Sequence, residues 1–221
     1  MPKRTAPPPP QQARSRESLR RMLDAAEVVL EKRGVEGTTL ARVARQAGIT
    51  PSNVYRRFRN KDALLAAVFD RFTDINRREL DTPVDTGQLA ALGIRRFTKQ
   101  CISAMIQGFR TRTGLIRAAV SYSHQQPTAE FVRRKEAVEI QVFQRTVSLF
   151  LLWRDEIRHP NPEYAVSYAL VMIALVLREL IVFGHAPMFE KLVPVDDEHL
   201  RQELPRLFLS YLGVDPNTIE R

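Results

Sequence analysis

The sequence predicts an all-α chain with a short helix-turn-helix module near the N-terminus and a larger helical bundle after it. Apolar residues recur at helical spacing along most of the 221 residues, and no segment with the alternating period of a strand reaches a useful length. Two short helical patterns also meet across a glycine at residues 38–59. Together these observations predict three helices around that turn, a fourth helix as connector, and a body of packed helices.

Basic charge is concentrated at the front of the chain. Residues 1–61 hold 14 Lys and Arg against 5 Asp and Glu, whereas residues 62–221 hold 20 of each. The formal net charge of +9 therefore comes entirely from the N-terminal part. Such a distribution is typical of an anion-binding module attached to a neutral body, with nucleic acid or an acidic membrane surface as partner.

The first 14 residues have the composition of a disordered arm. They contain four consecutive prolines and lack the apolar run that a secretory signal requires. Ser15 can then cap a helix over residues 16–33, and Gly34 can end it. Four arginines near its start can either approach a flanking phosphate or remain solvated: Arg14, Arg16, Arg20 and Arg21.

The next helical pattern is short and well delimited. Apolar residues at i, i+3, i+4 and i+7 from Leu40 form one face of a helix that Thr38 or Thr39 can cap. Gly48 then ends this helix.

The helix after the turn has equally clear start signals. Thr50 can cap it, and Pro51 stands at its first position, where a missing amide costs no hydrogen bond. Val54 and Phe58 form its buried face, so its polar residues must point outward. Short hydrogen-bonding groups suit base edges in a major groove and arginines suit phosphates, so this pattern favours a DNA-reading helix. The outward polar residues are Ser52, Asn53, Arg56 and Arg57.

The segment AxxAGITPSNVYRRFRNKDALL resembles the signature of the TetR family of bacterial transcriptional regulators. The resemblance covers about residues 15–72 and implies an N-terminal DNA-binding domain at residues 15–80, connector helix included. By position, Thr39 and Tyr55 resemble phosphate-contacting residues, and Lys61 resembles the lysine that opens the fourth helix and clamps the DNA backbone. Ala41 stands where some members place a base-reading arginine, and neighbouring Arg42 could replace it. The base-facing positions correspond to Pro51, Ser52 and Asn53.

Further along, Asn60 can cap the fourth helix, which keeps helical spacing to about Leu80. The turn-rich stretch DTPVDTG at residues 81–87 is the predicted domain boundary, so the body should span residues 86–215. The pattern predicts that the helices of the body cover residues 88–109, 113–123, 127–157, 162–183 and 196–212, with Pro205 kinking or restarting the last one.

The segment at residues 162–183 is apolar around most of its circumference and could span a bilayer by length. Arg178 and Glu179 argue against a membrane, because unpaired charges are costly in hydrocarbon. We therefore interpret it as a buried helix or a subunit interface. The two charges then either pair with each other in the bundle or face a ligand cavity. The TetR resemblance implies that residues 162–184 and 196–212 pair across a two-fold axis in a homodimer.

Catalytic signals are absent from the sequence. The four histidines lie at no metal-ligand spacing, and no glycine-rich phosphate loop follows a strand, so we expect no metal, no cofactor and no enzyme activity. Cys101 is the only cysteine, which excludes an intramolecular disulfide and fits a reducing cytoplasm. It lies on an apolar stripe, which favours a packed thiol over a redox sensor.

The resemblance implies a cytoplasmic homodimeric repressor that binds a palindromic double-stranded DNA operator. A small, mostly apolar ligand in the body would release it by moving the fourth helix and, with it, the DNA-reading helices. The alternatives are a DNA-anchored interaction protein without an inducer and, third, a helical enzyme. Candidate ligand contacts are Cys101, Met105, Tyr122, Tyr168, Met172 and Arg178.

Overall fold

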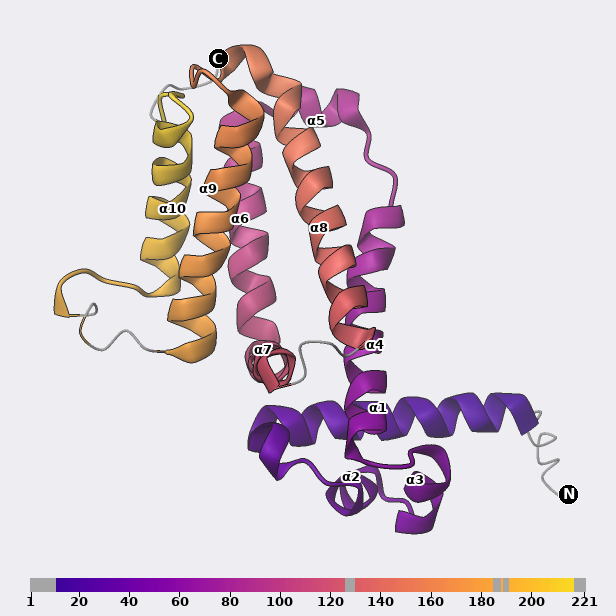
Figure 1. Ribbon diagram of the computed structural model, residues 1–221. Coiled ribbons are helices and arrows are strands. Elements are labelled where there is room, and N and C mark those ends of the chain that lie inside the picture. Colours follow the sequence, from indigo (N-terminus) through magenta and orange to yellow (C-terminus); the bar gives the residue numbers. More distant parts are fainter. Residues whose placement is uncertain (1–10, 126–129, 185–187, 189–190, 217–221) are drawn as a thin grey trace, which may run out of the picture. The chain divides into compact units, whose positions relative to one another are not determined.

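The computed structural model describes residues 11–125, 130–184, 188 and 191–216, and every regular element within them is helical (Figure 1). The predicted all-α fold class is therefore confirmed. The chain divides into two compact units, one ending at Arg71 and the other beginning at Phe72. The part of the predicted arm before Gln11 lies outside the described residues.

The first unit contains three complete helices and about half of a fourth. In it α1 packs on α2, and α2 packs on α3. Its core draws on all four helices, including Leu30, Val43, Val54 and Phe69. The helices are α1 (Gln11–Gly37), α2 (Leu40–Ala47), α3 (Pro51–Arg57) and α4 (Lys61–Asp81), the last of which ends in the second unit.

The start of α1 corrects the sequence prediction. The helix begins at Gln11, so residues 11–14 are helical and Ser15 lies inside the helix instead of capping it. Residues 11–14 read QQAR and contain no helix breaker, and alanine, glutamine and arginine are all good helix formers. Gly34 interrupts the helical dihedral angles with φ 63° and ψ −173°, close to the predicted stop.

An ion-pair cluster holds α4 on α1 within the first unit. The Arg71 guanidinium lies 2.7 Å from the Asp24 carboxylate through Nη1 and 2.5 Å from the Glu27 carboxylate through Nη2. These groups are only partly exposed, so solvent screens the cluster less than it screens a surface pair. Each of the two terminal nitrogens of Arg71 therefore has a carboxylate partner, so the guanidinium is not free to bind a ligand.

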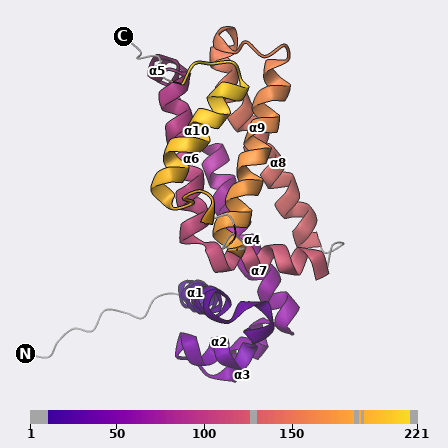
Figure 2. The same ribbon diagram turned by 90° about the vertical axis from the view of Figure 1, so that its left-hand side faces the viewer.

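In the second unit, Figures 1 and 2 show α6, α9 and α10 side by side, with α8 next to α9. Aromatic rings fill the centre, where Phe150 lies 4.7 Å from Phe97 and 4.8 Å from Phe208 between ring centroids. The elements are α5 (Thr86–Leu92), α6 (Ile94–Thr111), α7 (Thr113–Gln125), α8 (Glu130–Phe150), the 3₁₀ helix η1 (Leu151–Glu156), α9 (Pro162–Leu177), the π-helix η2 (Arg178–Phe183) and α10 (Asp197–Tyr211).

Two predicted helices of the body contain a residue with non-helical dihedral angles at or near which they are divided. The pattern at 88–109 forms α5 and α6, because Gly93 adopts φ 78° between them. The pattern at 127–157 ends its α-helical part at Phe150 and continues as η1, in which Trp153 has φ −110° and ψ 32°. The Trp153 indole N–H donates to the Ala90 carbonyl at 3.2 Å, so one hydrogen bond ties the two breaks together. The start predicted at Pro127 lies outside the described residues.

The last two segments agree with the predicted bounds, although residues 162–183 change from α9 to the π-helix η2 at Arg178. Asn161 caps α9 by accepting the Tyr164 amide at 3.1 Å, and Asp196 caps α10 by accepting the amides of two residues of its first turn. Of the two outcomes predicted for Pro205, a kink or a restart, the restart is wrong, because α10 runs through Pro205 without interruption. Pro205 is buried, and its packing offsets the hydrogen bond that a proline cannot make.

One side of these helices carries unburied apolar side chains. The segment Pro162–Phe183 is long and apolar enough to cross a membrane by composition, yet it packs on α6, α8 and α10. The rings of Tyr168 of α9 and Tyr211 of α10 lie 5.7 Å apart between centroids with tilted planes, so the exposed surface is continuous over both helices. We call this surface the α9–α10 face, and its large apolar residues are Tyr164, Tyr168, Val171, Met172, Leu175, Val176, Leu207 and Tyr211.

Candidate nucleic-acid interface

The turn between α2 and α3 is fixed at both ends by local hydrogen bonds. Thr39 has an extended backbone, and its hydroxyl accepts the Arg42 amide at 3.2 Å, which caps α2. Gly48 adopts φ 65°, and the Ile49 amide reaches back to the Ala44 carbonyl at 3.0 Å. The sequence therefore dictates where α2 stops and in which direction the chain leaves it.

The start of α3 is set by Thr50 and Pro51. Thr50 occupies the N-cap position as predicted, and its carbonyl accepts the Asn53 amide at 3.0 Å. Its side chain makes no capping bond to a backbone amide, because the hydroxyl lies 3.1 Å from the Ser52 hydroxyl instead. The two hydroxyls together form a small polar group at the exposed tip of the helix.

The two faces of α3 differ sharply in exposure. Val54 is 0% exposed and Phe58 is 6% exposed, so this side anchors the helix in the core. Tyr55 is 56% exposed even though it is aromatic. Outward-facing aromatic and polar groups on a buried anchor form a surface that can enter a groove. The other residues of α3 that were predicted to contact DNA also face solvent, although Asn53 is only partly exposed. They are Pro51, Ser52, Asn53, Arg56 and Arg57.

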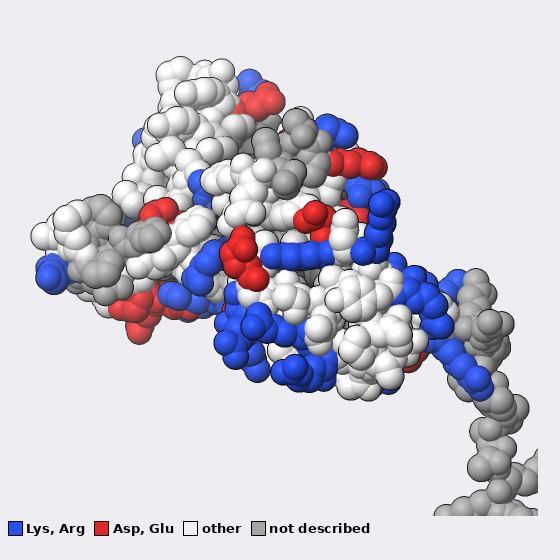
Figure 3. Space-filling view, turned by 60° about the horizontal axis from the view of Figure 1, so that its bottom comes forward, with Lys and Arg blue, Asp and Glu red and all other residues white. Residues whose placement is uncertain are grey.

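The cations of the first unit divide into two groups by their partners. Arg21 donates to the Ala47 carbonyl at 2.9 Å, and Arg42 donates to the Gly37 carbonyl at 2.6 Å, so both brace the fold. Other cations have no hydrogen-bond or ion-pair partner among the described residues, which leaves them free for an external anion: Arg45, Arg56, Arg57, Arg59 and Lys61. Lys and Arg side chains accordingly gather on the surface of this unit (Figure 3).

Arg45 and Arg59 were missed by the sequence interpretation. Arg45 lies on the exposed side of α2, opposite the buried Val43 and Ala44, and Arg59 lies between α3 and α4. The helical period alone could have identified Arg45, because it falls off the apolar face. Arg59 stands in no regular element, and its exposure depends on how the chain turns there.

Lys61 stands at the first position of α4, as the sequence predicted. The Asn60 side chain accepts the Ala63 amide at 2.9 Å and so caps the helix. A cation in the first turn opposes the helix dipole by about 0.3–1 kcal/mol, and Asp62 offsets part of this effect. An external phosphate beside Lys61 and the α4 amides would remove the unfavourable term.

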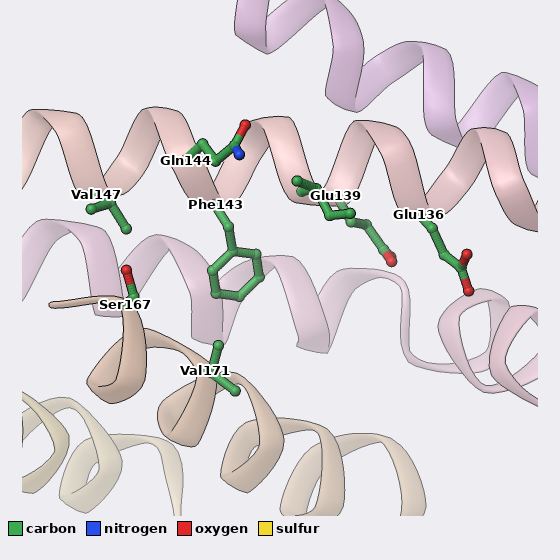
Figure 4. A pocket seen from close by; sticks show the side chains of 8 residues that line it. Glu136, Glu139, Phe143, Gln144, Val147, Ser167 and Val171 are labelled. Carbon is green, nitrogen blue, oxygen red and sulfur yellow. The ribbon is translucent and has the colours of Figure 1, made fainter. Parts of the chain in front are cut away.

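The second unit contains an open groove between α8 and α9 with a volume of about 430 Å³. Figure 4 shows Phe143 pointing toward α9 and the two carboxylates toward one end of the groove. The Glu139 carboxylate forms an ion pair with Lys135, with Oε2 and Nζ 2.8 Å apart, whereas Glu136 has no ion-pair partner among the described residues. The groove is lined by Glu136, Glu139, Ile140, Phe143, Gln144, Val147, Ser167 and Val171.

The six residues predicted to contact a ligand are not brought together, and none lines this groove. Cys101 and Met105 pack against the core, and burial raises the pKa of the Cys101 thiol to about 11, which supports the packed-thiol interpretation. Tyr122 is buried against Phe131 at 5.6 Å.

The other three lie near the surface of the last helices. Tyr168 and Met172 belong to the α9–α10 face, and Arg178 begins η2. Neither Arg178 nor Glu179 has an ion-pair partner among the described residues, so the predicted salt bridge between them is not formed. Within the same residues, no three His, Cys, Asp or Glu side chains are placed to hold a metal ion.

Comparison with known proteins relates residues of the first unit to a family of regulators. Residues 22–68 match the family model described as "Bacterial regulatory proteins, tetR family". Two curated relatives, both from Pseudomonas putida, match over 99 residues, which are 44% of this chain and 47% of each relative. They are "Probable HTH-type transcriptional regulator ArpR", at 31% identity, and "HTH-type transcriptional regulator TtgR", at 30% identity. The matched part of the chain thus spans about half the length of these relatives.

Solved structures resemble the fold over nearly the whole chain. A transcriptional regulator from Rhodococcus sp. Rha1 has a TM-score of 0.63 at 18% identity, covering 91% of this chain and 100% of its own. GusR of Salmonella enterica has a TM-score of 0.62 at 15% identity, covering 89% and 96%. FadR from Bacillus subtilis, solved in complex with stearoyl-CoA, has a TM-score of 0.57 at 16% identity, covering 87% and 98%. At these identities the likeness concerns the fold.

Proposed function

We propose, for a chain whose residues 22–68 belong to the TetR family of bacterial regulatory proteins, that it is a homodimeric repressor of transcription that binds a palindromic DNA operator. The observation that carries this proposal is the capped α2–α3 turn, which holds a polar first turn of α3 in solvent beside unpaired cations. Such a protein would act in the cytoplasm, at the nucleoid while bound.

In this proposal the exposed residues of the first unit divide between bases and phosphates. Ser52 and Asn53 are the short polar groups at the tip of α3, where side chains reach base edges, and Pro51 offers an apolar contact beside them. Phosphate contacts fix the register without reading sequence. We assign phosphates to Thr39, Arg42, Tyr55, Arg56, Arg57 and Lys61, where Arg42 must release the Gly37 carbonyl to take part.

Asn53→Ala and Lys61→Ala should both weaken DNA binding, but only Asn53→Ala should reduce the preference for the operator sequence. Asn53→Ala should weaken binding to the preferred operator by about 1–3 kcal/mol and leave binding to random DNA nearly unchanged, because a lost base contact removes discrimination. Lys61→Ala should weaken binding to both and reduce the slope of log K against log salt by about 0.9 per protomer. Titrations of both DNAs at several salt concentrations measure the two effects. An unchanged operator-to-random ratio for Asn53→Ala would remove Asn53 from the base-reading set.

Dimerisation is proposed through the α9–α10 face. Several large apolar side chains remain exposed there in a single chain, and a second copy would cover them by a two-fold axis. A two-fold dimer also suits a palindromic operator, because its two copies of α3 can bind two half-sites about one helical turn apart.

The proposed effector is a small molecule with an apolar body, held in the groove between α8 and α9. The groove volume lies within the range of small-molecule sites, and its floor is apolar. Because the charged groups lining it are carboxylates and Phe143 offers a ring face, we propose that the effector carries a positive charge. Its binding would favour a state in which α4 places the readers out of register with the operator, since a ligand shifts an equilibrium by its differential affinity. In the alternative, a DNA-anchored interaction protein, no compound in this groove would change operator affinity.

Glu136→Gln should reduce a preference for cationic ligands. Benzyltrimethylammonium and its neutral carbon isostere neopentylbenzene differ only in charge, and the cation should bind the natural protein a few-fold more tightly, as expected for about 0.5–1 kcal/mol. Calorimetry with Glu136→Gln should show a smaller difference between the two affinities, because Phe143 and Glu139 still line the groove. The matched control is Glu163→Gln, an exposed carboxylate of α9 that does not line the groove. Equal affinities for the natural protein would contradict the cationic class and leave the DNA-binding proposal intact.

A further inference from the structure

The N-terminal part of α1 lies outside the region that matches the family model. The helix begins at Gln11, whereas the match begins at residue 22. Figure 1 shows this part of α1 extending past α2 and α3 of the same unit. It carries two exposed arginines, Arg14 and Arg16, whose side chains have no partner among the described residues. The two side chains differ in the direction in which they leave the helix.

The hydrogen bond between Arg21 and Ala47 shows which side of α1 faces the helix-turn-helix. Its Nη2 group donates to the carbonyl of Ala47, the last residue of α2, at 2.9 Å. A helix turns by about 100° per residue, so Arg14, seven residues earlier, lies within about 20° of the same side. Arg16 lies about 140° away from Arg21 and points elsewhere. Arg14 therefore extends the side of α1 that meets the DNA-reading motif.

No neighbouring carboxylate on α1 neutralises Arg14. Glu17, one turn further on, accepts hydrogen bonds from Arg20 at 2.7 and 3.0 Å, and this pairing lowers the pKa of Glu17 below its usual range. Asp24 forms an ion pair with Arg71, with Oδ1 and Nη1 2.7 Å apart. Arg14 is consequently a free cation, while Arg20 is already occupied.

We propose that Arg14 binds a DNA phosphate outside the base pairs read by α3, so that α1 lengthens the operator beyond the helix-turn-helix footprint. This inference rests on the proposed DNA-binding function. At about 1.5 Å of rise per residue, Arg14 lies about 10 Å beyond Arg21 along α1. Phosphates of one strand follow each other at about 3.4 Å along the DNA axis, so for an α1 that runs along this axis the added reach corresponds to about three base pairs.

The test compares Arg14→Ala with Arg16→Ala in the full chain. Both variants remove one arginine from the same exposed helical segment, but only Arg14→Ala removes a cation from the side of Arg21. On a selected operator, Arg14→Ala should lower the salt slope by about 0.9 per protomer, and Arg16→Ala should leave it unchanged. Arg14→Lys should restore the slope, because a phosphate needs only a positive charge. Circular dichroism of each variant checks that α1 keeps its helicity.

A second measurement shortens the DNA flanks. Removing about three base pairs from each end of the operator should weaken binding of the natural protein several-fold and leave Arg14→Ala unaffected. Equal slopes for the natural protein and Arg14→Ala would overturn the inference, as would equal losses for both alanine variants, which would indicate a general charge effect. If the natural protein selects no DNA sequence at all, the proposed function itself fails, and that outcome is distinct from either of these.

Discussion

A chain with aspartate at both Met172 and Val176 should sediment as a monomer at concentrations where the natural protein is expected to be a dimer. The two residues stand one helical turn apart on α9, lie outside the α8–α9 groove, and are 42% and 37% exposed. Because they face outward in the single chain, the substitutions should leave its fold and helicity unchanged. In a two-fold dimer they would place four carboxylates in an apolar interface.

The expected size of the effect follows from the cost of burying charge. At about 1 kcal/mol or more for each unpaired polar group, four carboxylates raise the dimer dissociation constant by a factor of about 10³ or more. Sedimentation equilibrium measures this constant. Val84→Asp is the control, since Val84 is also exposed but lies in the bend between α4 and α5. A double variant that stays dimeric at micromolar concentration would contradict the interface.

The second large effect concerns the core of the second unit. Phe150→Ala should lower the free energy of unfolding of this unit by about 3–5 kcal/mol, because the ring is fully buried between Phe97 and Phe208 and its removal leaves a cavity. Trp153 is the only tryptophan, so its fluorescence during urea titration reports this unit alone.

The control for this prediction is Leu192→Ala, which truncates a side chain that is 75% exposed and lies outside the α9–α10 face. It should change stability by less than about 0.5 kcal/mol. A loss of less than about 1 kcal/mol for Phe150→Ala would show that the aromatic cluster is not the centre of the core.

The DNA-reading motif could be predicted from the sequence because its signals are local. The cap at Thr39, the left-handed position at Gly48 and the helix start at Pro51 each depend on backbone preferences within a few residues. The same reasoning placed Asn60 and Asn161 as caps of α4 and α9. Local rules failed at the start of α1, where Ser15 offered a cap that a continuing helix did not need.

The groove and the helix breaks of the body could not be predicted in this way. The groove exists because Phe143 of α8 and Val171 of α9 face each other, and helical periodicity within one segment says nothing about its register against another. The change to η1 after Phe150 coincides with the hydrogen bond from Trp153 to Ala90, which joins residues 63 positions apart. Arg14 stayed undecided for the same reason, because only the contact between Arg21 and Ala47 orients α1.

The measurement that tests sequence-specific operator binding most directly is selection of bound DNA from a random duplex pool with the purified full chain, followed by sequencing. The natural protein should enrich a two-fold symmetric motif whose half-site centres lie about one helical turn or a multiple apart. Asn53→Ala should lose that enrichment while still retaining duplex DNA at low salt. A pool from the natural protein that stays random, or an enriched motif without two-fold symmetry, would contradict a dimeric operator-binding regulator.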